Sequence, residues 1–584
     1  MSTRSVAGGA TALAVVGDRL VVAGDTSRLT IIDPAGAMHT TAMASPPISI
    51  AAAGQRVLVG VSGLGADHDG GTLVVRVAGP VDVDPAECCD VITAMALLSY
   101  DSLLGYSTLP STLGTVIPDL ALAVPEPRDH GLRYTFRLRP GLRYSNGEPV
   151  RASDFRRGLE RAAQSSETYA AYLEALPGAL ACTHAPRCDL RTAVLTDDRA
   201  GTVTLRLTHP DPSLLTALGL VYFAPLPAGA GTGIRPGTGP YRITQVVPGR
   251  LVVFTRNPRF RDWSPAAQPA GYPNRIVVRY NGTPAADVTA VINGHADYTF
   301  DSPTAAQLKQ IELRSPGLLH REPEPETDYL DLNTREPPFN DVRVRRALND
   351  AIDRDAIAKL YGGLGAATPT CQIIPVTIPG HVPFCPYTLH PSRDGHWTAP
   401  ALQRARQLIA QSGTRGEHVT ILTQAPSGPW DEPVARYVAR VLRRLGYPTD
   451  VHVVTSGQWS TAMTDYRHPP QIDTNGWGAD VPSATDFITL PLSCDEWHPP
   501  TRLSNHSEFC DPAVDRIAAR AAQLQGTDPA AADRLWAHAD RIITNLAPWL
   551  TTVSPIETNL VSARTGNFNY VPINRVLLDQ IWIR

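Results

Sequence analysis

One stretch near the C-terminus combines residue types that could hold a ligand: Asp473-Thr-Asn-Gly-Trp-Gly-Ala-Asp480. Its first part is typical of a short buried strand, which breaks at Gly476 and Gly478. Glycines at such a break let backbone N–H and C=O groups face a molecule that lies alongside. Trp477 offers a large amphipathic wall, and Asp480 places a carboxylate at the end of the strand. Together these features suit a site that grips an extended ligand by its main chain and by a positively charged terminus.

The same two side chains also allow a purely structural interpretation. In that interpretation Trp477 is a core aromatic residue and Asp480 caps a helix. Both roles are common for these residue types. Position in the sequence alone leaves the two interpretations open.

Motifs of catalysis and cofactor binding are absent from the sequence. It contains no His-Glu-x-x-His, no Gly-x-Ser-x-Gly and no P-loop motif. The Gly-rich run 229–239 does not follow a strand–helix turn, so it makes a poor phosphate-binding loop. His381, His390 and His396 could assemble a metal site, but histidines on surface loops are far commoner than metal ligands. We therefore expect a non-catalytic protein with no cofactor and no metal; nickel or haem binding is the alternative.

Composition narrows the classes of partner. The chain has 584 residues, which predicts several domains, and 43% hydrophobic and 18% charged residues, as in folded proteins. A net charge of −4 argues against a nucleic-acid-binding surface. No apolar run approaches the ~20 residues of a transmembrane helix. The first residues lack an apolar signal region and a lipid-attachment cysteine, so we expect an export signal or membrane anchor only in a missing or fused segment.

The eight cysteines fall into four pairs that are local in sequence: Cys88/Cys89, Cys182/Cys188, Cys371/Cys385 and Cys494/Cys510. None has C-x-x-C spacing and no pair of histidines is near, which argues against a zinc site. The three loop-closing pairs predict disulfides and an oxidising, extracytoplasmic location, with buried free thiols as the alternative. A disulfide between the adjacent Cys88 and Cys89 would be strained, so their redox state stays open.

The elements that must position these residues change character along the chain. Residues 11–80 contain short strands between Gly-rich turns, and the stretch 17–23 recurs as 54–60. Second strands at 29–33 and 72–77 complete a pattern that resembles β-propeller blades. Two blades cannot close a ring, so we interpret 1–80 as a propeller-like fragment.

The stretch after Pro325 alternates between strands and helices. We predict strands at 329–333, 418–423, 449–454 and 471–476, and helices at 340–362, 401–412, 432–445 and near 459–464. Such alternation favours a largely parallel sheet with helices on its faces. Ligands bind such sheets outside the carboxyl ends of the strands, which is where residues 476–480 lie.

From about Val81 to Arg584, five stretches occur in an order that resembles one known family. They are 131–141, 144–154, 237–241, 333–354 and 476–480 with the cysteine pair that follows. The third reads Gly-Thr-Gly-Pro-Tyr and the last Gly-Trp-Gly-Ala-Asp. This order is similar to that of the family 5 extracellular solute-binding proteins of ABC transporters, the dipeptide-, oligopeptide- and nickel-binding group.

The resemblance implies an α/β fold of the two-lobed periplasmic-binding-protein type (class II), with a hinge that closes over the ligand. Lobe I of that fold is discontinuous and carries an inserted subdomain. Projected onto this chain, the parts are lobe I at 81–102, 238–325 and 545–584, the inserted subdomain at 103–237 and lobe II at 326–544. The small all-β segment at 1–80 precedes them.

The resemblance also implies roles for particular residues. Asp480 would pair with the α-ammonium group of a peptide, and Gly476 to Gly478, with Trp477, would pair with its main chain. The segment around Cys88, Cys89 and Asp90 would face them from lobe I. The pair Cys494–Cys510 looks like a disulfide of dipeptide-binding members.

One departure concerns the residues before the Gly-Trp unit. Thr474 and Asn475 stand where oligopeptide-binding members often have a basic residue near the C-terminus of the peptide. We count Asn475 among the ligand-binding residues. The carboxylate of a peptide must therefore find another partner here, or the ligand lacks one.

The function implied is capture of a peptide or another small solute and its delivery to an ABC transporter permease, with no nucleic-acid partner. A sugar, nickel chelate or haem is the alternative ligand. A ligand-sensing module of a larger regulatory protein is the alternative role.

Overall fold

The computed structural model describes residues 68–584 except 82, 86–90, 110–111, 212, 231–233, 364, 426–430, 466, 499–500, 503 and 526–527. Before residue 68 it describes the backbone of six strands. The chain divides into two compact units. Unit 1 comprises Met1–Thr208, Leu218–Asp301 and Leu560–Arg584, and unit 2 comprises His209–Ala217 and Ser302–Asn559. The units therefore change at 301/302 and 559/560, whereas the sequence predicted lobe boundaries at 325/326 and 544/545. The predicted lobe boundaries stay a prediction.

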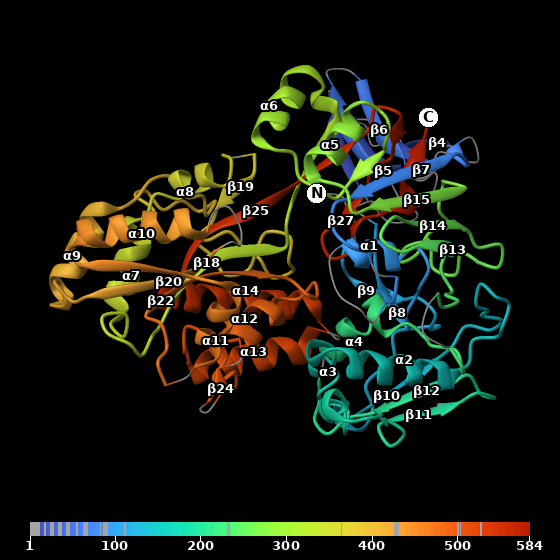
Figure 1. The fold of residues 1–584 in the computed structure, drawn as a ribbon, viewed down its shortest axis with the longest axis horizontal. Coiled ribbons are helices and arrows are strands. Elements are labelled where there is room, and N and C mark those ends of the chain that lie inside the picture. The colour runs from blue at the N-terminus through green and yellow to red at the C-terminus, as the bar shows by residue number, and fades with distance from the viewer. Residues whose placement is uncertain are drawn as a thin grey trace. The chain divides into compact units, whose positions relative to one another are not determined.

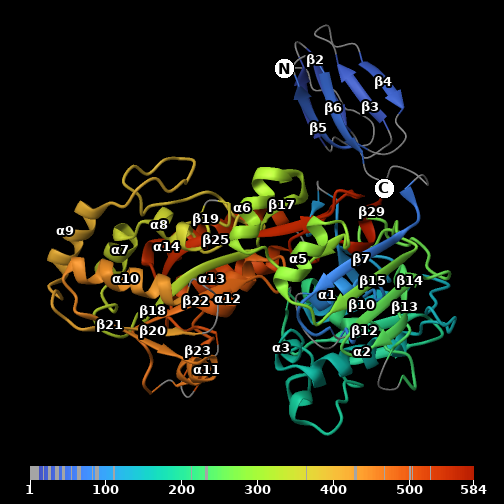
Figure 2. The same ribbon diagram turned by 45° about the horizontal axis from the view of Figure 1, so that its top comes forward.

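The N-terminal segment is all-β, as predicted. Strands β1 (Ala12–Val16), β2 (Arg19–Ala23), β3 (Arg28–Ile32) and β4 (Met38–Ala42) form an antiparallel sheet in sequence order (Figure 2). Strands β5 (Pro47–Ala53) and β6 (Arg56–Val61) form a hairpin. The expected second strand of a further blade, at 72–77, does not join them. It is strand β7 (Thr72–Val77) of the large sheet, so the prediction that these residues belong to a second blade was wrong.

Unit 1 is built on a mixed sheet whose core strand is β7. The order is β13 (Tyr241–Val247), β14 (Leu251–Arg256), β15 (Arg275–Tyr280), β7, β16 (Tyr298–Thr299) and the end of β25 (Trp549–Val561). β7 runs parallel to β15 and β16, and its buried residues alternate with partly exposed ones. Leu73 and Val75 pack with Ile276 and Val278 into one core.

A smaller antiparallel sheet stands within residues 103–237. It has the order β10 (Arg133–Arg137), β12 (Thr202–Arg206) and β11 (Val194–Asp197), with α2 (Ala152–Ser165) as the main helix beside it. The remaining short elements of unit 1 are α1 (Val91–Ala96), β8 (Leu104–Tyr106), β9 (Val116–Pro118), α3 (Glu167–Ala171), α5 (Pro284–Ile292), β26 (Thr565–Gly566), β27 (Tyr570–Val571), β28 (Arg575–Val576) and β29 (Trp582–Ile583).

Unit 2 has a sheet between two layers of helices (Figure 1). From β25 the order is β18 (Glu326–Leu332), β22 (Ile472–Gly478), β20 (Val419–Gln424) and β21 (Thr449–Val454). The helices of one layer are α7 (Val342–Ala351), α8 (Arg354–Leu360), α9 (Leu402–Ser412) and α10 (Asp431–Leu445). Those of the other are α12 (Ala484–Leu492), α13 (Pro512–Gln525) and α14 (Pro529–Leu546).

The expectation of a largely parallel sheet was wrong for half of these pairs. β22, β20 and β21 run parallel, whereas β18 is antiparallel to both β22 and β25. Hydrophobic alternation reports that a strand exists but carries no information on its direction. The other elements of unit 2 are α4 (Ser213–Ala217), α6 (Ala305–Arg314), β17 (Leu319–Pro323), β19 (Ala367–Pro369), α11 (Ser456–Thr464), β23 (Trp497–His498) and β24 (Thr501–Arg502).

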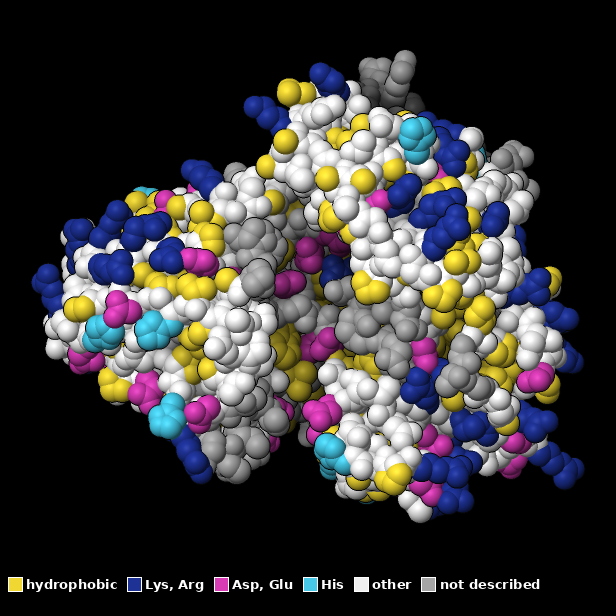
Figure 3. All heavy atoms as spheres, viewed as in Figure 1, with side chains coloured by type: hydrophobic (Ala, Val, Ile, Leu, Met, Phe, Trp, Pro, Cys, Tyr) yellow, Lys and Arg dark blue, Asp and Glu magenta, His cyan; other side chains and the backbone are white. Residues whose placement is uncertain are grey.

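Three disulfides join the loop-closing cysteine pairs that the sequence predicted: Cys182–Cys188, Cys371–Cys385 and Cys494–Cys510. Cys88 and Cys89 lie outside the described residues. None of the helices in the described part of the chain is long and apolar enough to span a bilayer. On the visible face, basic and acidic side chains occur interspersed, in line with the small net charge of −4 (Figure 3).

Candidate functional site

Strand β22 carries the predicted ligand-binding stretch, and half of it forms a sheet edge. β18 pairs with all of β22, from Ile472 to Gly478. On the other side β20 pairs with Ile472 and Asp473, and the hydroxyls of Thr423 and Thr474 bond at 2.8 Å. Among the described residues, no strand pairs with β22 on this side beyond that point.

The ladder determines which backbone groups of β22 face that edge. Just beyond the strand, the N–H of Ala479 donates to the carbonyl of Pro325 on the β18 side, at 2.8 Å. Because residues of an antiparallel strand face alternate neighbours, Trp477 also bonds toward β18, while Gly476 and Gly478 face away from it. The N–H of Gly476 donates to the side-chain oxygen of Asn475 at 3.0 Å. The two glycines thus present their main chain at the edge.

Two carboxylates on β18 leave no room for a side chain at residue 476, which explains why this residue is a glycine. A Cβ atom at this position would lie 2.3 Å from Asp328 Oδ1 and 3.1 Å from Glu326 Oε1. Asp328 is buried and accepts a hydrogen bond from the hydroxyl of Tyr361 at 2.7 Å. Burial and the neighbouring Glu326 raise the pKa of Asp328 well above its usual range.

Trp477 serves the core and is also partly accessible. It lies opposite Thr327 in the register, on the sheet face that packs against α12–α14. Its half-buried ring packs against the cluster that contains Phe487 and Trp549. The structural interpretation of this residue therefore holds in part, because Trp477 packs against the core but is not fully buried.

Asp480 follows the strand and is exposed. Its backbone N–H donates to Asp486 Oδ2 at 2.6 Å, and the next N–H, of Val481, donates to the same oxygen at 3.2 Å. Burial, and next the charge of Asp480, raise the pKa of Asp486 well above its usual range. The N-cap of α12 is Ser483, so Asp480 does not cap that helix. Asp486 thus fixes the turn from which Asp480 projects.

The loop closed by Cys494–Cys510 brings a further polar group to this sheet face. Asn505 holds the loop, because its amide donates to the carbonyls of Ser493 and Phe509 at 2.9 and 2.7 Å. The following residue, His506, has its Nδ1 atom 3.1 Å from Asn475 Nδ2. The same amide nitrogen donates to Asp331 Oδ2 at 3.0 Å. Asn475 therefore links β22 to β18 and to the loop.

Unit 1 contains two neighbouring buried aspartates, Asp101 and Asp119. Together with Gln268 and other residues they line a small cavity of about 20 Å³. Asp101 is 4% exposed, and its Oδ1 has no hydrogen-bond partner among the described residues. Burial raises the pKa of Asp101 to about 7. Burial, and next the charge of Asp101, raise the pKa of Asp119 well above its usual range.

Comparison with known proteins assigns the family. Residues 115–499 match the family described as bacterial extracellular solute-binding proteins, family 5 middle. The chain belongs to family 5. It is similar to the glutathione-binding protein GsiB of Escherichia coli K12, with 26% identity over 498 residues that cover 83% of this chain and 88% of GsiB.

Solved structures show the same two-lobed fold of periplasmic binding proteins. The clavulanic acid biosynthesis oligopeptide binding protein 2 aligns with a TM-score of 0.75 at 24% identity, over 88% of this chain and 96% of that one. The periplasmic murein tripeptide binding protein MppA, in an unliganded open form, gives 0.73 at 20% identity, over 88% and 97%. Haemophilus influenzae OppA, in complex with RPPGFSPFR, gives 0.62 at 20%, over 88% and 98%.

Within this family 5 chain, the predicted site residues fall into two groups. Asn475, Gly476, Trp477, Gly478 and Asp480 lie together at the end of β22. Cys89 and Asp90, expected to face them, lie outside the described residues. The three histidines considered as metal ligands do not gather: the metal-ligand grouping found in the described part of the chain contains none of them.

Sequence reasoning missed the polar residues that surround this strand: Glu326, Asp328, Asp331 and His506. A signal for three of them was present, because acidic residues inside a strand of otherwise buried character are unusual. His506 gave no such signal, since its partners are more than thirty residues away in sequence.

Proposed function

We propose that this chain is an extracytoplasmic binding protein that captures a peptide-like solute between its two lobes and delivers it to an ABC permease. One observation carries the proposal. The edge of β22 at Gly476 and Gly478, which no strand in the described part of the chain covers, leads within two residues to the exposed Asp480.

The edge supplies the main-chain part of recognition. A peptide lying along it would accept hydrogen bonds from backbone N–H groups and donate to backbone carbonyls, as an added strand does. The absence of a side chain at both glycines lets the peptide approach the backbone closely. The N–H of Gly476 donates to the side-chain oxygen of Asn475 at 3.0 Å. This hydrogen bond must break before the same N–H can donate to a peptide.

Asp480 supplies the charged part of recognition. An α-ammonium group at the end of the added strand would meet this carboxylate in a charge-assisted hydrogen bond. The turn that presents it is held by two backbone bonds to Asp486, so little conformational entropy remains to be lost on binding. Trp477, which is half-buried, would flank the peptide.

The relatives support a peptide as the solute class. One similar protein is named for glutathione, a second for a murein tripeptide, and a third is solved with the nonapeptide RPPGFSPFR. We propose that the segment around Cys89 and Asp90 faces β22 from lobe I, with the lobe boundaries expected from the sequence. The three disulfides agree with an oxidising compartment outside the cytoplasm.

The N-terminal strands fit a propeller-like fragment, which we propose as a separate element. β1 to β4 form a four-stranded antiparallel sheet in sequence order, the arrangement of one propeller blade.

The test is native mass spectrometry and calorimetry with a mixture of tripeptides to pentapeptides. We expect one bound peptide per chain. For a tight-binding peptide, Asp480→Asn should weaken binding by about 1–3 kcal/mol through loss of the charge-assisted bond. N-acetylation of the peptide should weaken wild-type binding by a similar factor and should have little further effect on Asp480→Asn.

The matched control is Asp450→Asn, which changes an exposed aspartate of the same unit that pairs with His418. It should leave peptide affinity unchanged. A chain that binds no peptide would contradict the proposed solute class. Equal affinities of wild type and Asp480→Asn would contradict the role of this carboxylate.

A further inference from the structure

Three side chains of metal-ligating type converge beside β22: Asp331 of β18, Asp473 of β22 and His506 of the disulfide-closed loop. His506 Nδ1 lies 3.8 Å from Asp331 Oδ2 and 3.9 Å from Asp473 Oδ2. All three ligand atoms lie within 4.8 Å of one another. The side chains of the two aspartates are 2% and 1% exposed, and that of His506 is 12% exposed.

The two carboxylates are direct neighbours across the ladder. Asp331 is paired with Asp473 in the β18–β22 register, so both side chains point to the same face. Two ionised carboxylates in this position would repel each other, and burial would strengthen the repulsion. A cation between the two aspartates would relieve this repulsion.

Two of the three ligand atoms accept from the same donor, the side-chain amide of Asn475. An amide nitrogen can only donate, so this group holds the lone pairs of His506 Nδ1 and Asp331 Oδ2, and it must turn away before an ion can take them. His506 is therefore in the tautomer whose Nδ1 accepts, which is the form that binds a metal. The ligand atoms must move inward by only a few tenths of an ångström to reach metal–ligand distances of roughly 2.0–2.2 Å.

We propose that Asp331, Asp473 and His506 bind a divalent transition-metal ion. Two carboxylate oxygens and one imidazole nitrogen suit Zn²⁺ or Mn²⁺, and three protein ligands leave at least one position for water. The ion would tie β18, β22 and the loop together beside Asn475. It is a second site, separate in chemistry from the carboxylate of Asp480, and it does not depend on the proposed function.

The experiment is titration of the chelator-treated full chain with Zn²⁺, followed by calorimetry and native mass spectrometry. We expect one tightly bound ion. Asp473→Asn and His506→Gln should each weaken Zn²⁺ binding about 10- to 100-fold or more, since each removes a ligand. The control His418→Gln removes an exposed histidine, 56% exposed and paired with Asp450, and should not change the affinity of that ion.

Thermal unfolding separates a metal site from a merely structural cluster. Zn²⁺ should raise the Tm of wild type and of His418→Gln, but not that of Asp473→Asn or His506→Gln. Without metal, Asp473→Asn should unfold at the same or a higher temperature than wild type, because one of the two adjacent buried carboxyl groups is replaced by a neutral amide. Absence of stoichiometric Zn²⁺ binding, or binding that survives His506→Gln, would overturn the proposal.

Discussion

Asp328 on β18 lies directly opposite Gly476 on β22, and its carboxylate covers the position that a side chain at residue 476 would take. The distance from Asp328 Oδ1 to such a Cβ atom is 2.3 Å, well inside van der Waals contact. Asp328 is also held by Tyr361 and packed in the sheet, so it has little room to withdraw. The glycine and the carboxylate are thus parts of one arrangement at the candidate peptide edge.

This relationship predicts the cost of filling the edge. Gly476→Ala should lower the free energy of unfolding by about 1–3 kcal/mol, because the methyl group displaces a buried, hydrogen-bonded side chain. Gly478→Ala is the matched control, since its Cβ would lie 3.4 Å from the nearest atom, Glu326 Oε2. Chemical denaturation of both variants measures the difference. Equal losses would show that the contact with Asp328 does not cause the effect.

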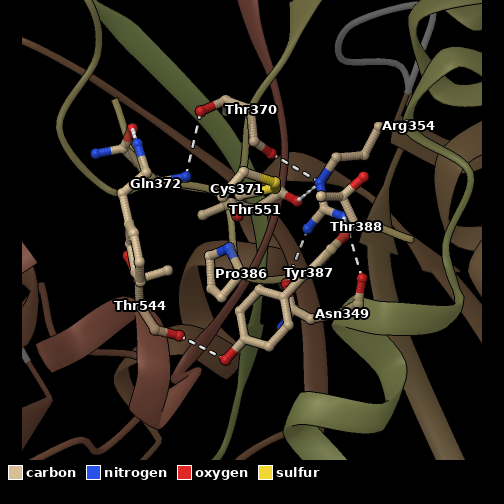
Figure 4. Close-up of a disulfide and its surroundings, with 12 residues drawn as sticks. Asn349, Arg354, Thr370, Cys371, Gln372, Pro386, Tyr387, Thr388, Thr544 and Thr551 are labelled. Carbon is tan, nitrogen blue, oxygen red and sulfur yellow. Dashed lines mark hydrogen bonds between the residues drawn. A yellow bond between two sulfur atoms is a disulfide. The ribbon is translucent and has the colours of Figure 1, made fainter. Parts of the chain in front are cut away.

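Arg354 shows a different way of burying charge. Its guanidinium is fully buried and donates to the carbonyls of Thr370, Thr551 and Asn349 and to the side-chain oxygen of Asn349 (Figure 4). Burial lowers the pKa of Arg354 to about 10, so it stays protonated at neutral pH. The bonds join α8, the Cys371 loop and β25 at one point.

Arg354→Lys should therefore be poorly tolerated. An ammonium group cannot reach acceptors that lie on several sides of a planar fork, so buried carbonyls lose their donors. We expect the free energy of unfolding to fall by about 2–4 kcal/mol, measured by urea denaturation. Arg343→Lys changes an exposed guanidinium that pairs with Asp341, and a much smaller effect is expected there. A loss for Arg354→Lys no larger than the control would contradict this account.

Sequence patterns located the elements of unit 2 well but not all of their ends. The strand predicted at 449–454 matches β21, and the helix predicted from Glu432 to Leu445 matches α10 to within one residue. The helix expected to run from Asn340 to Gly362 is instead two helices, α7 and α8. Asp353 divides them, because its side chain caps α8 by accepting from the N–H of Ala356. A capping residue inside an apolar pattern is easily missed.

The residues of the candidate site also divide into those that a local sequence pattern could predict and those that depend on tertiary contacts. Gly476, Trp477 and Asp480 are contiguous, so a local pattern could predict them. The contacts of Asn475 with Asp331 and His506 depend on strand order and on a loop 31 residues further along the chain. Strand pairing is set by tertiary packing, and no local periodicity encodes it.

The buried carboxyls of unit 1 predict a pH dependence of stability. Asp101 has a pKa of about 7 in the folded protein, and that of Asp119 is also raised, while both have ordinary values in the unfolded chain. The folded state therefore binds more protons than the unfolded state between about pH 4 and pH 7. The free energy of unfolding should fall as pH rises through this range.

Asp101→Asn should remove the part of this slope that Asp101 causes. At pH 8 the variant should be more stable than wild type by about 1–4 kcal/mol, and at pH 4 the two should be similar. Denaturation at several pH values measures the slope. Asp129→Asn, in an exposed ion pair with Arg133, is the control and should keep the wild-type slope. A variant whose pH profile parallels that of wild type would show that Asp101 does not carry the shift.

The Cys494–Cys510 disulfide should matter more than its shorter counterpart. It closes a loop of 16 residues, whereas Cys182–Cys188 spans 6. In the chain-entropy account, replacing Cys494 and Cys510 by serine should lower the free energy of unfolding by about 3 kcal/mol. Replacing Cys182 and Cys188 by serine should lower it by about 1 kcal/mol less than that.

Hydrogen exchange adds a local test of the same pair of variants. The longer loop carries Asn505 and His506, which contact Ser493, Phe509 and Asn475. Loss of Cys494–Cys510 should therefore speed amide exchange at residues 505–509 more than in the rest of unit 2. Loss of Cys182–Cys188, in unit 1, should leave exchange at these residues unchanged. Uniformly faster exchange in both variants would mean that the disulfide stabilises the chain globally and does not specifically hold His506 against β22.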